Sequence, residues 1–333
     1  RAFTRVYADA ARQAAKVSDT LRAAGQARSS IEGLPVSVKD LFDVAGDTTL
    51  AGSVALQGHP AATEDAVAVQ RLKAAGAVIL QQLYHIGAHG DSDLSFAPHW
   101  SPSGHASYHD SDGSHRMTEA EIWELIDAHV AAAVRCKAAG FQGVEVWAAY
   151  HSLLDQFWTP WSNRRDDRWG GSLENRTRLS RTIIEGIRRA CGEDFIIGLA
   201  ISYSTAYSVT LDAEALTEIV ALHDATGHVD YVTCGFGSYL EFEGIIPAFT
   251  EGEKLTTPLT ARLKAVVKHA VITSEAGVRT PDNAETILAS GEADMVSIVR
   301  GQIADPHLAR KTAEGRASDI RSCISCNQMC WGR

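Results

Sequence analysis

The sequence predicts an α/β fold in which parallel strands alternate with helices, and three observations lead to it. Short β-branched runs follow segments of helical periodicity from about residue 78 to residue 299. Helix boundary signals bracket these segments, as where Thr118 and Glu121 form a capping box and Gly140 ends the helix. Strands joined through helices of this length make right-handed crossovers, so we expect a parallel sheet.

Six strands are expected, at Val78 to Leu83, Gly143 to Trp147, Ile196 to Ile201, Val229 to Thr233, Ala270 to Ser274 and Met295 to Val299. The expected helices are 8–24, 65–75, 118–139, 173–190, 213–225, 257–268 and 281–289. Unusual loops follow several strands, as in a (β/α)8 TIM barrel, whose chemistry lies at the C-terminal ends of its strands. The sequence therefore predicts a TIM-barrel-like fold that lacks its first two strands.

Composition narrows the class of protein. Of the 333 residues, 45% are hydrophobic and 22% are charged, which is typical of a globular protein. A net charge of −10 disfavours nucleic acid and anionic membranes as partners. No run approaches the ~18 to 20 apolar residues that span a bilayer, and the first residues lack a signal-peptide core. We expect a cytoplasmic protein that acts on a small molecule, and the two ends of the chain suggest a fragment.

The most specific motif is the segment 156–176, QFWTPWSNRRDDRWGGSLENR. Read from its residues, it is a polar loop closed by a double-glycine turn before a helix that Ser172 caps. The segment resembles the old yellow enzyme family of NADH:flavin oxidoreductases. That resemblance covers residues 82–333 and includes the QLYH motif at 82–85. It implies an FMN-dependent oxidoreductase.

The same resemblance implies residues for the FMN site. Gln82 would contact the flavin ring, and backbone amides around Gly277, Val278 and Arg279 would hold the phosphate, completed by Arg300. Elementary physics agrees, because amides beside a helix N-terminus bind anions and an arginine adds paired hydrogen bonds. The alternative is a tight strand-to-helix loop with Arg300 as a surface charge.

Three cysteines, Cys323, Cys326 and Cys330, have a spacing suited to an iron–sulfur cluster, with zinc as the competing metal and unrelated surface thiols as the alternative. Their context resembles the 4Fe–4S segment of the dienoyl-CoA reductase and trimethylamine dehydrogenase branch. The resemblance implies a fourth ligand beyond the chain end. It also implies an electron-transfer partner or a missing C-terminal domain.

Two positions depart from the common family pattern. Trp147 and Tyr150 stand where enoate reductases usually carry a His pair, or His and Asn, that grips a substrate carbonyl. An aromatic pair suits a methylated ammonium group instead, as in amine dehydrogenases and N-methyl amino-acid demethylases. The alternative is that Trp147 packs in the barrel and only Tyr150 or His151 faces substrate. Ala200 stands where the family usually carries an Arg that stabilises reduced flavin, so the flavin should be harder to reduce unless another cation substitutes.

The front segment resembles a different family. Residues 33–40, GLPVSVKD, and 71–77, RLKAAGA, are similar to the N-terminal quarter of amidase-signature hydrolases. The resemblance makes Lys39 the base of a Ser, cis-Ser, Lys relay, but both serines are absent, so we expect no amidase activity. The extended run 34–38 could fill part of the gap left by the two missing strands.

These observations give the expected organisation. Residues 1–80 are an amidase-like fragment, 81–318 an FMN-binding domain and 319–333 the start of an iron–sulfur segment. The expected function is FMN-dependent demethylation of N-methylated amines or amino acids, with electrons passing to the 4Fe–4S cluster. The alternatives are an NAD(P)H-dependent enoate or 2,4-dienoyl-CoA reductase and an inactive fusion fragment. The polar segment 89–115 is expected to be an exposed loop in which His105, His109 and His115 are solvated, the alternative being that the three histidines hold a metal.

Overall fold

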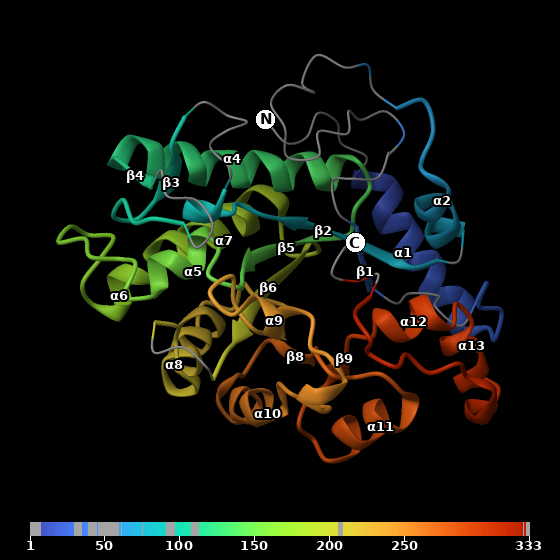
Figure 1. The fold of residues 1–333 in the computed structure, drawn as a ribbon. Coiled ribbons are helices and arrows are strands. Elements are labelled where there is room, and N and C mark those ends of the chain that lie inside the picture. Colours follow the sequence, from blue (N-terminus) through green and yellow to red (C-terminus); the bar gives the residue numbers. More distant parts are fainter. Residues whose placement is uncertain are drawn as a thin grey trace. The chain divides into compact units, whose positions relative to one another are not determined.

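The computed structural model describes residues 8–29, 35–38, 45, 60, 62–74, 76–90, 97–107, 113–205, 209–328 and 330 (Figure 1). The chain divides into two compact units. The first takes its described residues from 1–83, 123–146 and 182–198, and the second takes them from 84–122, 147–181 and 199–333. No helix in the described ranges combines the length and apolar character needed to cross a membrane.

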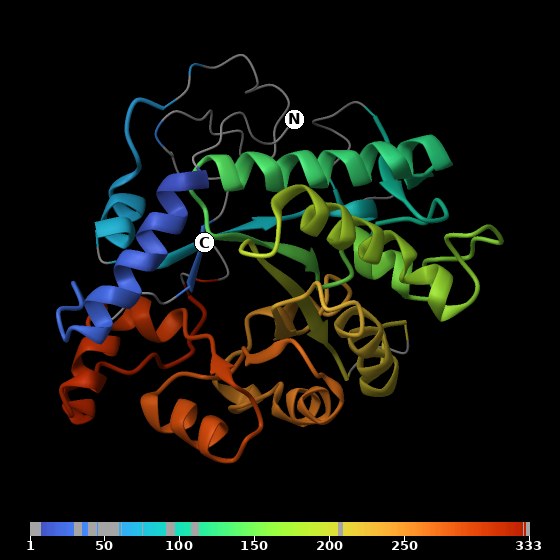
Figure 2. The same cartoon turned by 180° about the vertical axis from the view of Figure 1, so that it is seen from behind.

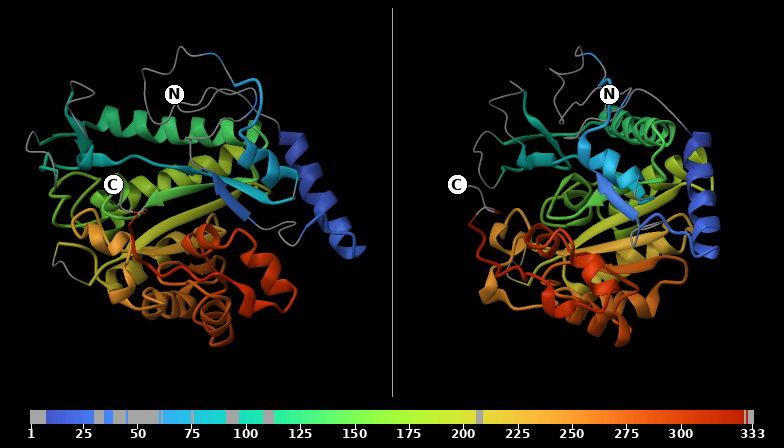
Figure 3. Two further views of the ribbon diagram at one scale, coloured as in Figure 1. Left: turned by 45° about the vertical axis from the view of Figure 1, so that its right-hand side comes forward. Right: turned by 90° about the vertical axis from the view of Figure 1, so that its right-hand side faces the viewer.

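The first unit is built on parallel strands. Strand β1 (Pro35–Val38) pairs with β2 (Val78–Leu83), as Figure 3 shows, and β2 pairs in turn with β5 (Gly143–Ala148). Its helices are α1 (Ala8–Ala23), α2 (Val67–Ala74), most of α4 (Glu119–Ala138) and most of α7 (Arg178–Cys191). Strand β6 (Ile196–Tyr203) begins in this unit and ends in the other.

The second unit continues the alternation of strands and helices. Strand β7 (Tyr231–Phe236) pairs in parallel with β8 (Val271–Ser274), and β8 with β9 (Met295–Val296). Helices α8 (Ala213–Asp224) and α10 (Thr257–Val266) lie side by side, which is also visible from behind in Figure 2. The other elements are η2 (Gly87–His89), β3 (His99–Ser101), β4 (Ser114–Arg116), α5 (Leu153–Trp158), α6 (Leu173–Arg176), α9 (Phe242–Ile245), η3 (Phe249–Glu251), α11 (Pro281–Ala289), α12 (Arg300–Ala304), α13 (Leu308–Ala313) and η4 (Ala317–Asp319).

The main sheet has the strand order β1-β2-β5-β6-β7-β8-β9. All six predicted strands are present in the predicted order, so the α/β alternation is confirmed. The seventh strand, β1, comes from the front segment and pairs with β2. In a complete barrel, the two strands that this chain was predicted to lack would come before β2.

Local signals explain most element boundaries. The predicted capping box is present, because Thr118 N–H donates to the Glu121 carboxylate at 2.7 Å and Glu121 N–H to the Thr118 hydroxyl at 3.3 Å. The predicted helix 173–190 is wrong in one respect, since it is split at Thr177, whose hydroxyl donates to the Leu173 carbonyl at 2.9 Å. The last predicted strand is also too long, since it ends at Val296 and α12 begins at Arg300.

The segment 89–115 differs from the exposed loop that was predicted. Strands β3 and β4 pair in parallel within it, and Ser101 and His89 are buried. Three-residue strands in polar sequence show no periodicity, so the sequence could not predict them.

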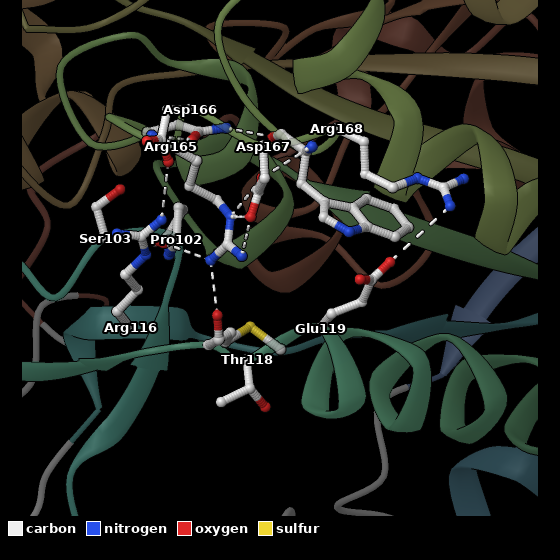
Figure 4. A network of polar contacts seen from close by, with 12 residues as sticks. Pro102, Ser103, Arg116, Thr118, Glu119, Arg165, Asp166, Asp167 and Arg168 are labelled. Atoms are coloured by element: carbon white, nitrogen blue, oxygen red, sulfur yellow. Dashed lines mark hydrogen bonds and ion pairs between the residues drawn. The ribbon is translucent and has the colours of Figure 1, made fainter.

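Arg165 binds this segment to the predicted family motif (Figure 4). The guanidinium is buried and its Nη1 donates to the carbonyl oxygens of Pro102, at 2.9 Å, and Met117, at 2.7 Å. Its Nε donates to both carboxylate oxygens of Asp167 at 3.0 Å. One side chain thus connects the loops before β4 and after it to the loop that follows α5.

We expect Arg165→Ala to lower the free energy of unfolding by about 3 kcal/mol, because two buried carbonyl groups lose their donor and a carboxylate loses its partner. Arg116→Ala is the matched control. Arg116 bonds the exposed Asp166 at 3.4 Å, and such surface pairs contribute less than about 1 kcal/mol. Urea unfolding measures both, and equal losses for the two variants would contradict the assignment.

Candidate active site

Four aromatic rings, which we call the aromatic cluster, meet in the second unit. The rings of Trp147 and Tyr150 are edge to face with centroids 5.2 Å apart. The ring centroid of Tyr84 lies 6.3 Å from that of Trp147, and the ring centroid of Tyr239 lies 6.3 Å from that of Tyr150. The hydroxyl oxygens of Tyr84 and Tyr239 are 2.7 Å apart. In β7, a Cβ atom on Gly235 would come within 2.8 Å of the Tyr150 hydroxyl, so glycine leaves room for that ring.

The structure thus brings together the two aromatic residues that the sequence indicated, Trp147 and Tyr150. Tyr84 and Tyr239 were missed as site residues. Tyr84 lies in the QLYH motif and follows β2, whereas the signal for Tyr239 was its position after β7, since barrel chemistry lies at the ends of the strands.

The loop after β5 has an unusual backbone at the cluster. Tyr150 and His151 both have left-handed conformations, with φ of 60° and 63°, which cost non-glycine residues about 1 to 3 kcal/mol each. Three hydrogen bonds offset this cost. Tyr150 N–H donates to the Ser202 hydroxyl at 2.7 Å, His151 N–H donates to the Asp155 carboxylate at 2.7 Å, and the Tyr150 carbonyl accepts from Tyr239 N–H at 3.0 Å.

His151 is buried, and protein groups occupy both of its ring nitrogens. Its Nε2 lies 3.1 Å from the Ser162 hydroxyl, which donates its proton to the Gln156 carbonyl and therefore accepts from Nε2–H. Its Nδ1 then accepts from His89 Nε2 at 2.8 Å. These contacts give His151 a positioning role in the loop, and its catalytic role stays a prediction.

The imidazoles of His105 and His151 are neutral near pH 7. Burial, followed by the neighbouring imidazoles of His89 and His105, holds the pKa of His151 well below its usual range. His105 was predicted to be solvated but is half-buried, with its ring 5.8 Å from that of His151 and 5.6 Å from that of Trp161. Burial, and then Arg164, lower the pKa of His105 to about 4. His109 lies outside the described residues.

The predicted phosphate loop follows β8. Ala276 and Gly277 are left-handed, with φ of 63° and 75°, and their carbonyl groups accept from Leu255 N–H and Lys254 N–H. A Cβ atom on Gly277 would lie 2.9 Å from the Lys254 nitrogen, so only glycine fits. Among the described residues, nothing accepts a hydrogen bond from the N–H groups of Gly277 and Val278. Two consecutive unused amides before α11 fit an anion such as a phosphate.

Two arginines lie at this loop. Arg279 donates from Nε to Glu253 at 3.1 Å and from Nη1 to the Ser325 hydroxyl at 3.0 Å, so a carboxylate balances its charge. Arg300 donates from Nη1 to the Pro247 carbonyl and to Asn327 Oδ1, both at 2.8 Å. Within the described ranges Arg300 forms no ion pair, which leaves it as the cation available to a phosphate.

The other sequence-indicated residues take different places. In the first unit, Gln82 is half-buried and donates from Nε2 to the Glu145 carboxylate at 2.8 Å, so its flavin contact stays a prediction. Ala200 is buried in β6. Cys323 is half-buried and accepts from Ser325 N–H at 3.4 Å, whereas the other two cysteines of the segment are exposed.

The three thiols do not form a ready ligand set. Within the part of the chain that the structure describes, no group of three or more His, Cys, Asp or Glu side chains is placed to hold a metal. A metal cluster at these thiols therefore rests on the cysteine spacing and on the family resemblance of the segment.

Two unused backbone amides at the end of a parallel strand, together with an arginine that forms no ion pair among the described residues, fit a protein that binds an anionic cofactor. The chain belongs to the NADH:flavin oxidoreductase / NADH oxidase family, whose family model matches residues 47–319. The match confirms the predicted old yellow enzyme resemblance. An amidase family model matches residues 1–83, also as predicted, although Lys39 lies outside the described residues.

Two curated relatives of this chain are much longer than the chain itself. The N,N-dimethylglycine/sarcosine dehydrogenase of Chromohalobacter salexigens is 34% identical over 256 residues, covering 76% of this chain and 37% of that protein. The NADH oxidase of Thermoanaerobacter brockii is 39% identical over 217 residues, covering 65% and 33% respectively. The chain therefore spans less than two fifths of either relative.

A solved structure agrees with the fold. A 2-naphthoyl-CoA reductase bound to 2-naphthoyl-CoA matches with a TM-score of 0.72 and 30% identity, covering 77% of this chain and 41% of that chain. Together with the family match, this confirms the TIM-barrel-like α/β class. The predicted domain boundaries at residues 80 and 318 remain a prediction.

Gly277→Ala should lower the free energy of unfolding by about 2 to 3 kcal/mol, from the left-handed backbone plus the close approach to Lys254. Gly291→Ala is the matched control, because Gly291 has a φ of 71° but open space around its Cβ position. It should cost only about 1 kcal/mol. Denaturant unfolding measures the difference, and equal costs would show that the loop is not closely packed.

Proposed function

We propose that this protein is part of an FMN-dependent oxidoreductase that oxidises N-methylated amines or amino acids and removes the methyl group. The observation that supports this substrate class is the aromatic cluster, which lies where related reductases usually bind a carbonyl group. The name of one relative, a dimethylglycine/sarcosine dehydrogenase, supports the same substrate class.

The aromatic cluster would bind the substrate through its charge. Each electron-rich ring face attracts a desolvated ammonium group by ~1 to 2 kcal/mol. The neutral imidazoles of His105 and His151 add no positive charge that would oppose binding. The Trp147 indole N–H is buried and has no acceptor among the described residues, so it could donate to the carboxylate of an amino-acid substrate.

FMN would be held at its phosphate by the unused amides of Gly277 and Val278, by Arg279 and by the Arg300 guanidinium, and the family resemblance implies that Gln82 contacts the flavin ring. When bound, FMN supplies a hydride acceptor for oxidation of an N-methyl carbon. The chain's own groups bind the phosphate and orient the ammonium group, while buried rings exclude water around it.

The finer parts of the proposal rest on the sequence. The spacing of Cys323, Cys326 and Cys330 supports a 4Fe–4S cluster completed by a ligand outside this chain, with electrons leaving to a partner or a further domain. The mechanism proposed for this chain uses no step at the cluster, because the described thiols do not lie together as a ligand set. We also propose a cytoplasmic location and neither nucleic acid nor membrane as partners.

A second candidate is an NAD(P)H-dependent enoate or dienoyl-CoA reductase. Two names favour it, the NADH oxidase relative and the 2-naphthoyl-CoA reductase structure. The third alternative is an inactive amidase–flavoenzyme fusion, to which the front segment matching the amidase family points.

The first test of the proposal is the cofactor. Purified protein should show a flavin absorption spectrum and release FMN when heated, because the loop after β8 has two unused amides and, in the described part of the chain, no carboxylate pairs with Arg300. A colourless, well-folded protein that takes up no added FMN would favour the inactive fusion.

The second test concerns the aromatic cluster. Trp147→Leu and Tyr150→Leu should each weaken binding of dimethylglycine about tenfold, from ~1.4 kcal/mol of lost attraction between ring and cation. Cyclohexenone carries no charge and should be affected less. Titration calorimetry measures both ligands, and Trp123→Leu, on the exposed side of α4, is the matched control.

Equal losses for the amine and the enone would indicate general damage to the site. Tight enone binding with NAD(P)H-driven reduction, and no response to any N-methyl amine, would support the reductase alternative.

A further inference from the structure

The cysteine segment, residues 323–328, is bound to the loop after α9 and to the first residue of η3. Phe249 N–H donates to the Ser325 carbonyl at 3.2 Å, and Asn327 Nδ2 donates to the Ile246 carbonyl at 2.6 Å. Ser325 is buried, although its neighbours Ile324 and Cys326 are exposed. The segment is therefore anchored at alternate residues.

Those same two residues hold the two arginines of the phosphate loop. Ser325 Oγ accepts from Arg279 Nη1 at 3.0 Å, and Asn327 Oδ1 accepts from Arg300 Nη1 at 2.8 Å. The Asn327 amide has no freedom to reverse, because its Nδ2 already donates to Ile246 and so its oxygen faces Arg300.

The two arginines are themselves neighbours. A Cβ atom on Gly301 would lie 2.9 Å from the Arg279 carbonyl oxygen, so the first turn of α12 lies against the phosphate loop. The Pro247 carbonyl also accepts from Arg300 Nη1. Both contacts of Arg300 thus use one nitrogen, and they leave its Nε and Nη2 without a partner among the described residues.

The backbone of the segment is adapted to these contacts. Ser325 and Asn327 have left-handed φ values of 51° and 57°. Non-glycine residues adopt this conformation only where surrounding contacts impose it. The two left-handed residues are the ones whose side chains contact the arginines.

We propose that Ser325 and Asn327 are positioning residues of the FMN phosphate site, which act by orienting Arg279 and Arg300. This inference rests on the proposed FMN-dependent function. Its consequence is a linkage between the cysteine segment and the flavin. Any ligand that orders the cysteines also orders the arginines, and by thermodynamic reciprocity FMN favours the ordered segment equally.

The test compares FMN with riboflavin, which has the same ring system but no phosphate. Binding of each to the full chain is followed by quenching of flavin fluorescence. Asn327→Ala should weaken FMN about tenfold, equivalent to ~1.4 kcal/mol for a misdirected charge-assisted contact, and riboflavin less than about twofold. Asn327→Asp should weaken FMN further, because it neutralises Arg300 beside the phosphate. Gln328→Ala, an exposed neighbour, is the matched control.

Three outcomes would overturn the inference. Equal weakening of FMN and riboflavin would mean that Asn327 only supports the fold. Unchanged FMN binding in both Asn327 variants would mean that Arg300 needs no orientation. A wild-type chain that binds riboflavin and FMN with equal affinity would show that the phosphate is not bound at all, whereas failure to bind either flavin would refute the proposed function itself.

Discussion

The turn at Tyr150 and His151 is the constraint on which the site depends. Two successive left-handed residues are costly, and they persist because Ser202 at the end of β6, Tyr239 after β7 and Asp155 on α5 each bond their backbone. The turn directs the Tyr150 ring toward Trp147 and the His151 ring toward the interior. The aromatic and the imidazole sides of the site therefore have one common origin.

The sequence predicted those parts of the fold that depend on local signals. The bounds of β2 and α11 match their predicted residues, because the apolar run after Gly76 marks the strand and Thr280 with Pro281 marks the start of the helix. Strand β9 was predicted too long because apolar character continues past Val296 into a turn. Strands β3 and β4 have no periodic signal.

The site was predicted in part for the same reason. Trp147, Tyr150 and the phosphate loop lie in motifs that can be compared position by position. Tyr239 and His105 reach the site from loops distant in sequence, and no local pattern specifies that meeting. The contact between Asn327 and Arg300 likewise depends on the path of the chain after α13, and the cysteine spacing gave no indication of it.

Strand β1 has a consequence for how such a chain could arise. Pairing between parallel strands uses backbone groups only, so an unrelated segment can extend a sheet without matched side chains. The added strand has four residues and begins with Pro35, which has no N–H to offer a neighbouring chain. A short edge strand that starts with proline is a poor template for pairing with a strand of another molecule. A gene fusion that placed this segment here would cover β2 with a strand that is itself a poor template for pairing with another chain.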